Sequence, residues 1–404
     1  MATLTFQSLD FWEEQEKVRV NLSKRFYLEL EKQELERIAP CAVQQKSLEF
    51  SCSQERAERR FNALLAARMP ALRSILTKNQ AVYIHRNGGI PLTGSLSFGL
   101  IHRGTSIIEV KPQTTCNLDC VYCSVNEGLS SNQTDYLVER DYLLQEFDRL
   151  ADFLGVPVEA HIGVQGEPLF YHEFVELVAD LSAMEQVYQI STDTNGTLLT
   201  KPLLDQLARY PKLRLNISLN ALDREIASKM AGAGYNVPHV MEMIRYAAEK
   251  GVDFLIAPLY VPGYNDRELP KLAEFAKTLP KRDHPMLCIQ NFMNYTAGRN
   301  PVKALSWDAF REKLCALEKQ TGMRLLLDFK KDFKIAETRQ LPKPFRKGDT
   351  VQAVIAAPGR YPKTRLAVAN ERVITVFSSD APVSKEVKLK ILRSKHNIFF
   401  AEEL

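Results

Sequence analysis

The chain has no run of about 18 consecutive apolar residues, the minimum for a membrane-spanning helix, so we expect no transmembrane segment. Its first residues, MATLTFQSLDFWEEQEK, lack a basic stretch followed by an apolar one, so we expect no secretory signal. The glycines between residues 80 and 104 are not followed by Gly-Lys-Ser/Thr and do not form GxGxxG, which excludes a phosphate-binding loop there. These absences predict a cytoplasmic protein, in a compartment where thiols stay reduced.

Cysteine is also sparse, with seven in 404 residues. An odd number in a cytosolic chain does not predict a disulfide framework. Four cysteines are scattered, and we expect them to be structural thiols: Cys41, Cys52, Cys288 and Cys315. The other three lie within the eight residues 116–123, and so tight a group indicates a metal or catalytic site.

A length of 404 residues suits two or three domains of about 100–200 residues each. Residues 11–38 and 54–77 carry apolar side chains among many charges and predict helices, and residues 80–104 read as turns and hairpin strands. The predicted parts of the chain are a helical and hairpin extension (1–104), an α/β domain (105–330), a linker (331–346) and a small β-barrel (347–404).

From residue 105, short apolar runs alternate with helical patterns, which indicates βαβ units and a parallel sheet. The predicted strands are 106–110, 158–164, 189–194, 214–219, 253–261, 286–291 and 324–328. The predicted helices are about 137–154, 171–185, 200–210, 223–230, 238–250, 266–278 and 307–320. Seven strands suffice for an α/β fold of the partial (β/α)6 barrel type, in which the loops after the strands carry the chemistry.

The cysteine group follows the first of these strands directly, as Cys116, Cys120 and Cys123. A cube-shaped [4Fe–4S] cluster has four iron corners and is held by Cys thiolates. Three ligands in one loop leave the fourth corner open to a chelating molecule. Zinc is the alternative, but a structural zinc needs four ligands, and no further Cys or His follows at a suitable spacing before His161.

The CxxxCxxC spacing with an aromatic residue before the last cysteine resembles the signature of the radical S-adenosylmethionine (radical SAM) superfamily over residues 105–330. Further loops resemble family motifs in the same order: GVQGEP at 163–168, with Gln165 in place of a glycine, TNGT at 194–197, SLN at 218–220 and VPGYND at 261–266. The resemblance implies one [4Fe–4S] cluster on the three cysteines. It also implies SAM contacts from Tyr122, Gln165, Gly166, Glu167, Pro168, Thr194, Asn195, Ser218, Asn220, Val261 and Gly263.

The resemblance further implies that the reduced cluster cleaves SAM to methionine and a 5′-deoxyadenosyl radical, which takes hydrogen from a substrate. An external electron donor of the ferredoxin or flavodoxin type is then required. No general base is assigned. Polar residues after the sixth strand are candidates for substrate contact: Gln290, Asn291, Asn294 and Arg299.

The region after the linker contains five predicted strands, 350–356, 364–369, 372–378, 386–392 and 397–401, which favours an OB-like barrel. Residues 341–404 carry twelve Lys/Arg and six Asp/Glu, so basic charge gathers in this module. It resembles a TRAM-type RNA-binding domain, as in uncharacterised archaeal-type radical SAM proteins. Candidate RNA contacts are Arg346, Lys347, Arg360, Arg393 and Lys395, and candidate base-stacking or core aromatics are Tyr361, Phe377, Phe399 and Phe400.

Two functions stay open at this point. One is a radical SAM enzyme that modifies RNA, either tRNA or rRNA. The other is a radical SAM enzyme for a protein, lipid or small metabolite, in which the C-terminal barrel is purely structural. A non-enzymatic iron–sulfur electron carrier is a third reading, which SAM cleavage by the reduced protein would exclude.

Overall fold

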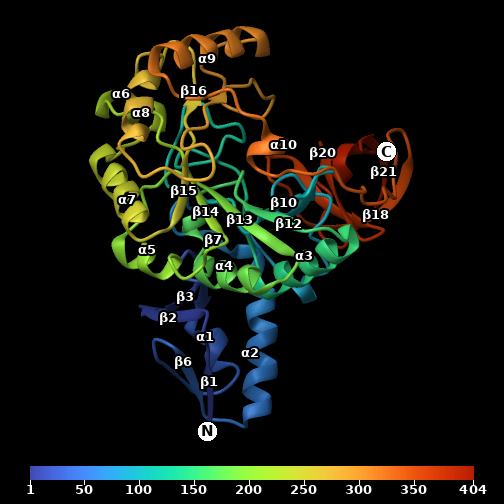
Figure 1. Cartoon of the computed structure of the whole chain (residues 1–404). Coiled ribbons are helices and arrows are strands. Elements are labelled where there is room, and N and C mark those ends of the chain that lie inside the picture. Colours follow the sequence, from blue (N-terminus) through green and yellow to red (C-terminus); the bar gives the residue numbers. More distant parts are fainter.

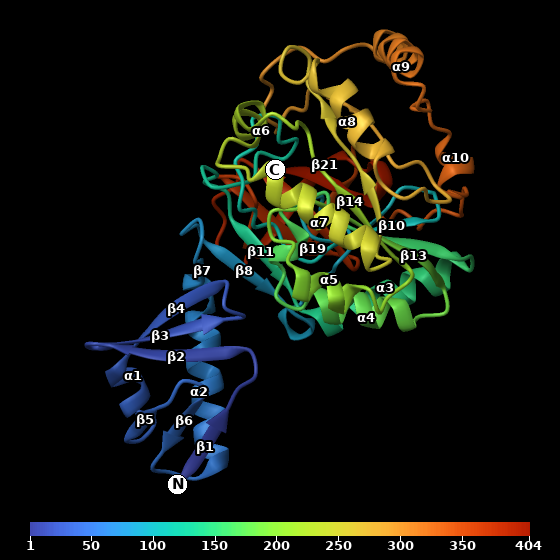
Figure 2. The same ribbon diagram turned by 60° about the vertical axis from the view of Figure 1, so that its left-hand side comes forward.

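The computed structural model covers residues 1–404, and the chain folds into three packed units. Figure 1 shows the N-terminal unit in blue, the α/β barrel in the middle and the C-terminal barrel in red at its side. In Figure 2 the N-terminal unit projects away from the other two. No helix has the length and apolar character needed to cross a bilayer.

The N-terminal unit is an α+β structure. Its elements are β1 (Ala2–Thr5), β2 (Leu9–Glu14), β3 (Lys17–Leu22), β4 (Phe26–Glu31), α1 (Lys32–Glu36), β5 (Cys41–Val43), β6 (Ser47–Phe50), α2 (Gln54–Arg68), a 3₁₀ turn (Met69–Ala71) and β7 (Arg73–Ser74). They form two sheets, β1-β6-β5 and β2-β3-β4-β7, with α2 packed beside β1 and β4.

The prediction of helix over residues 11–38 is wrong. In β3 and β4 every second residue is buried, including Val18 and Val20 in one strand and Leu28 and Leu30 in the other. A burial period of two is that of a strand with one face on the core. The helix predicted over 54–77 is confirmed in its first part as α2, which begins after the N-cap Ser53.

The α/β barrel begins earlier than predicted, because one strand of the predicted extension belongs to its sheet. Its elements are β8 (Ala81–Ile84), a 3₁₀ turn (Arg86–Gly88), β9 (Gly99–His102), β10 (Ile107–Lys111), β11 (Asp135–Val138), α3 (Arg140–Leu154), β12 (Val158–Ile162), a 3₁₀ turn (Pro168–Phe170), α4 (Phe174–Ala183), β13 (Val187–Thr194), α5 (Lys201–Leu207), β14 (Leu213–Ile217), α6 (Arg224–Ala231), α7 (Val237–Glu249), β15 (Asp253–Ile256), β16 (Leu259–Tyr260), α8 (Glu268–Lys277), β17 (Gln290–Asn291), α9 (Trp307–Thr321) and α10 (Phe329–Asp332).

The main sheet has the order β15-β14-β13-β12-β10-β9, and all its strands are parallel except β9. A bridge from Ile256 to Leu287 and the parallel pair β16–β17 continue the barrel beyond β15. The helices cover its outer side (Figure 1). The predicted partial barrel is therefore confirmed, with its open loops at the carboxyl ends of the strands.

Three predicted strands differ from the structure. The strand predicted over 253–261 is divided into β15 and β16. The strand predicted over 286–291 is reduced to β17. The segment 324–328 forms no strand, because the N–H groups of Leu325 and Leu326 donate to the carboxylate of Glu318 in α9 at 2.6 and 2.9 Å. A side chain thus takes the place of a strand partner.

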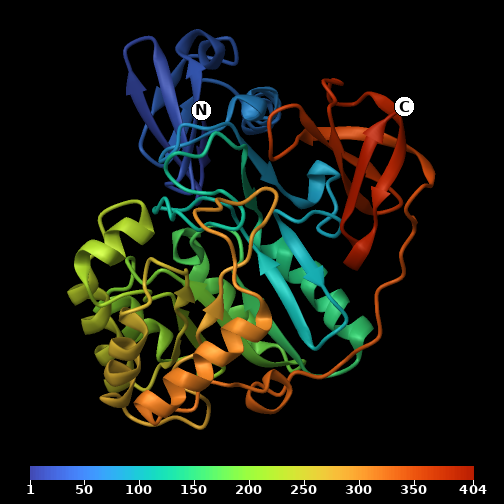
Figure 3. The ribbon, with the colours of Figure 1, turned by 90° about the horizontal axis from the view of Figure 1, so that it is seen from above.

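The C-terminal unit is a closed barrel of five strands. They are β18 (Thr350–Pro358), β19 (Thr364–Ala369), β20 (Arg372–Phe377), β21 (Glu386–Arg393) and β22 (Phe399–Glu403), with a 3₁₀ turn at Lys395–Asn397. The order is β18-β19-β20-β22-β21, and β21 pairs with β18 to close it. The OB-like expectation of a five-stranded barrel is confirmed. Figure 3 shows the preceding linker running along the edge of the molecule from α10 to this unit.

The C-terminal barrel docks on the loop before β9. The N–H groups of Val373 and Phe399 donate to the carbonyls of Thr93 and Gly94 at 2.9 and 3.0 Å. Gly94 has φ +125°, and a Cβ there would lie 2.2 Å from the carbonyl oxygen of Val373. The close approach of the two units therefore requires glycine at this position.

Candidate functional site

The three predicted cluster cysteines lie together in the loop after β10, and all three line one cavity of about 300 Å³ at the carboxyl ends of the strands. The loop is anchored to the end of α6, because Asp119 and Val121 donate their N–H groups to the carbonyls of Ala231 and Met230 at 2.9 and 3.0 Å. Burial raises the pKa of all three thiols. A thiolate in such surroundings needs a positive centre beside it, as an iron cluster provides.

The loop after β12 lies directly on the segment that precedes Cys116. Gly166 has φ +63°, and a Cβ there would lie 2.6 Å from the carbonyl oxygen of Thr115. The N–H of Glu167 donates to the same oxygen at 2.9 Å. The predicted SAM loop and the cysteine loop therefore form one packed unit.

The Glu167 carboxylate is fixed at the cavity wall by three donors. It accepts hydrogen bonds from the N–H of Leu169 at 3.1 Å, the hydroxyl of Thr194 at 2.7 Å and the N–H of Asn195 at 2.8 Å. Burial raises its pKa to about 7, against the lowering effect of these hydrogen bonds. A preorganised carboxylate of this kind suits an ammonium or amino group.

The turn after β13 is tied to the cysteine loop through Asn117. The Asn195 amide donates to the Asn117 side-chain oxygen at 2.9 Å, and the Asn117 amide donates to Thr197 Oγ1 at 2.9 Å. Thr194, Asn195 and Ser218 line the cavity. Residues from four strand ends thus converge on one space.

Tyr122 and Asn220 also line the cavity, and they hold each other. The Asn220 amide donates to the Tyr122 hydroxyl, and its oxygen accepts the N–H of Leu259 at 2.7 Å. Asn220 therefore orients Tyr122 from the cavity wall, and its predicted contact with SAM stays a prediction.

Four of the predicted SAM contacts do not line the cavity. The side chain of Gln165 donates to the carbonyl of Leu96 at 3.4 Å, and Pro168 is buried at the start of a 3₁₀ turn. The N–H groups of Val261 and Gly263 are bonded within their own turn, to Asn265 at 2.9 Å and Asp266 at 2.6 Å. These two N–H groups therefore already have partners, and the predicted backbone contact with adenine stays a prediction.

The predicted substrate residues divide into two groups. Gln290 and Asn291 line the cavity, and the buried Asn291 Oδ1 has no hydrogen-bond partner. Asn294 instead bonds within its own loop, to Asn300 and Val302.

The prediction that Arg299 contacts substrate is wrong. Its guanidinium pairs with Asp119 at 2.6 Å and donates to the carbonyl of Cys120 at 3.1 Å, and its N–H donates to the carbonyl of Cys123 at 2.8 Å. Arg299 does not line the cavity. It clamps the outer side of the cysteine loop.

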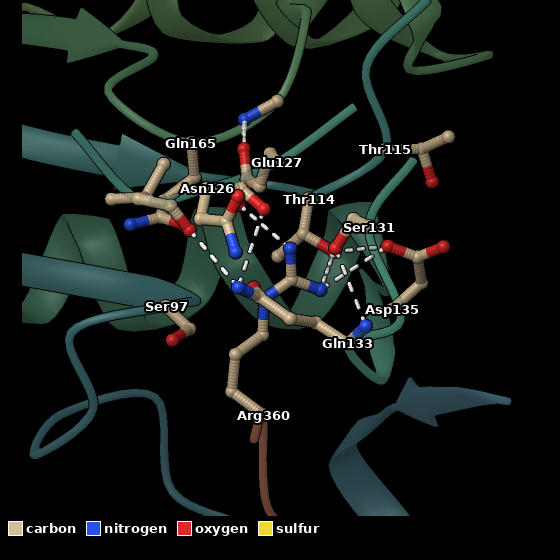
Figure 4. A network of polar contacts seen from close by, with 12 residues as sticks. Ser97, Thr114, Thr115, Asn126, Glu127, Ser131, Gln133, Asp135, Gln165 and Arg360 are labelled. Atoms are coloured by element: carbon tan, nitrogen blue, oxygen red, sulfur yellow. Dashed lines mark hydrogen bonds and ion pairs between the residues drawn. The ribbon is translucent and has the colours of Figure 1, made fainter. Parts of the chain in front are cut away.

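The predicted RNA contacts are exposed with one exception. Arg346, Lys347, Arg393 and Lys395 lie on the surface. Arg360 is only 4% exposed and pairs with Glu127 at 3.0 Å and Asp135 at 3.2 Å, inside the interface with the α/β barrel (Figure 4). The prediction that Arg360 binds RNA is therefore wrong, because neighbouring carboxylates cover it.

Several site residues had no signal in the sequence. Glu127 belongs to no motif, yet its N–H donates to Cys123 Sγ at 3.3 Å. Phe292, Met293 and Tyr295 line the cavity from the segment after β17. A search for polar residues alone could not have found these three apolar or aromatic liners.

The barrel interior beneath the cavity is polar. Asp193 lines the cavity and accepts from His161 Nε2 at 3.2 Å, while His161 Nδ1 bonds to Ser191 Oγ at 2.8 Å. Burial lowers the pKa of His161, but Asp193 outweighs this effect and the pKa rises to about 9. His161 is thus an interior histidine with a partner on each ring nitrogen.

The thiol loop, the fixed carboxylate and the surrounding polar turns form a site whose residues suit an iron–sulfur cluster with a small cofactor beside it. Residues 110–276 match the family model described as the radical SAM superfamily. The chain belongs to the radical SAM superfamily and is an enzyme of that class, whose cofactors are a [4Fe–4S] cluster and SAM and whose members need an external reductant.

Among its relatives is the uncharacterized protein MJ0103 of Methanocaldococcus jannaschii, 35% identical over 82% of this chain and 82% of the relative. The GTP 3',8-cyclase of Aquifex aeolicus is 27% identical over 44% of this chain, a match that spans 55% of the cyclase. Among solved structures, SuiB of Streptococcus suis superposes with a TM-score of 0.43 at 15% identity, over 80% of this chain and 70% of SuiB.

The residues present fit the implied cluster. Three thiols and no imidazole line the cavity, whereas a structural zinc takes four Cys or His ligands. A four-iron cluster is larger than one ion, and its thiolate ligands stand farther apart. The three thiols that share the cavity suit that larger group, with Glu167 and Asn195 on the same wall.

Proposed function

We propose that this radical SAM enzyme modifies RNA, with tRNA or rRNA as the substrate class, and that its C-terminal barrel binds the RNA backbone. The observation that carries the proposal is the charge of that barrel. Nine basic side chains of the barrel and the end of its linker are exposed: Lys343, Arg346, Lys347, Lys363, Lys385, Lys388, Lys390, Arg393 and Lys395. Neutralised phosphates release counterions, which drives binding to nucleic acid.

The outer side of β21 offers the clearest surface for RNA. Lys388 and Lys390 are exposed, and they alternate with buried Val387, Leu389 and Ile391. Beside this strand, the rings of Phe377 and Phe400 stack at 5.4 Å, and the Arg393 guanidinium lies 5.6 Å from the Phe400 ring centre. Exposed aromatic rings next to cations suit unpaired bases. Phe399, in contrast, is fully buried in the barrel core.

In the proposed cofactor site, Cys116, Cys120 and Cys123 hold the cluster. When bound, the cluster and SAM supply the one-electron cleavage that starts the reaction. The residues of this chain orient and enclose them. Glu167 would accept a hydrogen bond from the methionine amino group, and Thr194 and Asn195 would hold the carboxylate or ribose. Ser218 would contact the ribose, and Tyr122 would pack on adenine.

Asn291 is the best candidate for substrate contact, because its buried oxygen has no partner and an unpaired buried acceptor is costly. Gln290 lies beside it on the cavity wall. We further propose a ferredoxin- or flavodoxin-type donor. A cytoplasmic location is supported by the seven free thiols.

The second candidate is a radical SAM enzyme for a protein, lipid or small metabolite. It is favoured by the docking of the C-terminal barrel, because Arg360 and the Gly94 contact show that one face of this unit serves the enzyme itself. A barrel with a purely structural role would need only this docking face and no surface for a further partner.

The test is a gel shift of the full-length protein with tRNA over a range of salt concentrations. Replacing both Lys388 and Lys390 with glutamate should weaken binding about tenfold and lower the salt slope by about 0.7 per lost phosphate contact. A matched double variant, Lys24→Glu with Lys319→Glu, makes the same change in net charge on exposed residues of the other two units.

If both double variants weaken binding equally, the attraction is general and the barrel is not the RNA site. If the native protein shows no RNA affinity at low salt, the second candidate function replaces the first. The test keeps residues 341–404 in place, because their removal would also strip Arg360 from the catalytic unit.

A further inference from the structure

The turn between β18 and β19 inserts one arginine from the C-terminal barrel into the catalytic unit. Arg360 extends from this turn into a ring of polar side chains (Figure 4). Its backbone carbonyl accepts the N–H of Thr134 at 3.0 Å, and the Tyr136 hydroxyl donates to the carbonyl of Pro358 at 3.1 Å. The turn is therefore fastened on both sides of the arginine.

The Arg360 guanidinium bonds to both flanks of the cysteine loop. On the side before Cys116, Nη1 donates to Thr114 Oγ1 at 3.0 Å. On the side after Cys123, Nη2 donates to Glu127 Oε1 at 3.0 Å. One planar cation thus bridges the entry and the exit of the loop that carries all three thiols.

Glu127 carries this contact further into the site. Its second oxygen accepts the N–H of Gly166 in the loop after β12, and its own N–H donates to Cys123 Sγ at 3.3 Å. Gly166 lines the cavity. Arg360 therefore reaches both the third cysteine and the SAM loop through a single carboxylate.

Asp135 supplies a second anion to the same cation at 3.2 Å and accepts from Thr77 Oγ1 at 2.9 Å. Arg360, Glu127 and Asp135 are all at most 4% exposed. Removing the cation would leave two buried carboxylates without their common partner, and their present positions would lose the contact that holds them. The position of Glu127, and of the groups bonded to it, depends on Arg360.

We propose that Arg360 is a positioning residue of the catalytic site, which holds the cysteine loop and the SAM loop in register through Thr114 and Glu127. In this role the C-terminal barrel is part of the catalytic machinery. The proposal needs SAM binding at the cavity, but it is independent of whether the barrel binds RNA.

The test compares Arg360→Met with Arg360→Lys and with a control, Arg365→Met, all in the full-length chain. Arg365 is a half-buried arginine that bonds only within its own barrel, to the carbonyls of Ala381 and Thr364 at 2.9 and 3.0 Å. Three quantities are measured: hydrogen exchange of the cluster-free protein, SAM affinity after anaerobic reconstitution, and the electron paramagnetic resonance spectrum of the reduced cluster with and without SAM.

For Arg360→Met we expect faster exchange confined to residues 112–128 and 163–170, SAM binding at least tenfold weaker, and a smaller spectral change on adding SAM. Arg360→Lys should fall between this variant and the native protein, since it keeps the charge but loses the bridging fork. Arg365→Met should behave like the native protein in all three measurements.

Unchanged exchange with SAM affinity within twofold of native would overturn the proposal, as would an increase in exchange spread evenly over the molecule. If Arg360→Met does not accumulate as folded protein, the same measurements on Glu127→Gln decide, because this variant weakens the same link while keeping its shape. Native SAM affinity and native exchange in Glu127→Gln would contradict the proposal. Loss of RNA binding in the Lys388 and Lys390 variant, or its retention, leaves this result untouched.

Discussion

The buried cations of the α/β barrel and the exposed cations of the C-terminal barrel are used in opposite ways. Inside the α/β barrel, Arg214 pairs with Glu159 at 3.1 Å, and the fully buried Lys111 pairs with Glu109 at 3.2 Å. In the C-terminal barrel most basic side chains face outward, and Arg360 alone is buried. Burial, and not residue type, therefore decides whether a basic side chain forms an ion pair inside the protein or stays available to another molecule.

The largest expected effect is on the cluster. Cys120→Ala removes one of three ligands, so we expect bound iron to fall sharply and SAM cleavage to fall below detection. The RNA gel shift should persist, because the exposed basic surface belongs to the other barrel. Iron content and methionine release measure the first part. The control is Cys315→Ala, which removes a thiol on α9 that lies far from the motif in sequence. This variant should keep its iron. Undiminished iron in Cys120→Ala would contradict the ligand assignment.

Next in size is the difference between a buried and an exposed cation. Arg214→Met leaves Glu159 buried without its partner, which costs about 3–5 kcal/mol of unfolding free energy. Lys388→Met changes an exposed residue and should stay within about 0.5 kcal/mol of native. Urea unfolding of the two cluster-free variants measures both values. Equal losses would remove the contrast between the two barrels.

A smaller effect is expected for the carboxylate on the cavity wall. Glu167→Gln keeps the shape but replaces a charged acceptor, so SAM affinity should fall by about 1.5–3 kcal/mol, or roughly 10- to 150-fold. Iron content should stay native, since Glu167 is not a ligand. Equilibrium binding of SAM to the reconstituted variant tests this. A native affinity would mean that the methionine amino group lies elsewhere.

The smallest expected effect is on how folding stability depends on pH. One histidine in each barrel should change this stability with opposite sign. The pKa of folded His161 is raised to about 9, above its ordinary value of 6.5, so its stabilisation is complete below about pH 6.5 and is lost as the pH rises toward 9. Since Asp193 is 37% exposed, we expect only about 1 kcal/mol. In the C-terminal barrel, burial and then Arg103 and Lys395 lower the pKa of His396, so this residue costs stability only as the pH falls below 6.5.

The measurement is the unfolding free energy of the cluster-free protein at pH 6 and at pH 9, compared between the native chain and each variant. His161→Asn should lose the stability that the native protein gains at the lower pH, and His396→Asn should not. If both variants change stability in the same direction with pH, the assignment of the two environments is wrong.

Much of the site could be predicted because its motifs are local. Cys116, Glu167 and Asn195 each sit in a short loop directly after a strand, and parallel strands bring such loops to one edge. The partial barrel followed from the alternation of strand and helix patterns in the same way. In the N-terminal unit, the period-two burial of β3 and β4 was present in the sequence, but the many charged residues between the apolar ones obscured it.

The rest depended on contacts between distant segments. Arg360 and Glu127 meet across more than two hundred residues, and no local pattern distinguishes this arginine from the exposed Arg346 or Lys347. Arg299 likewise follows a strand end, as a substrate residue would, but it turns back onto the cysteine loop. The partner of a charge is set by the tertiary fold, which a charge count over one domain does not contain.

The central claim is that three thiolates hold a four-iron cluster with one iron open to SAM. Its most direct test is electron paramagnetic resonance of the anaerobically reconstituted and reduced native protein, before and after SAM is added, together with iron and zinc analysis. We expect about four irons per chain, no bound zinc, and a spectrum that changes when SAM binds. A spectrum that SAM leaves unchanged, a fourth cysteine ligand, or zinc in place of iron would contradict the account.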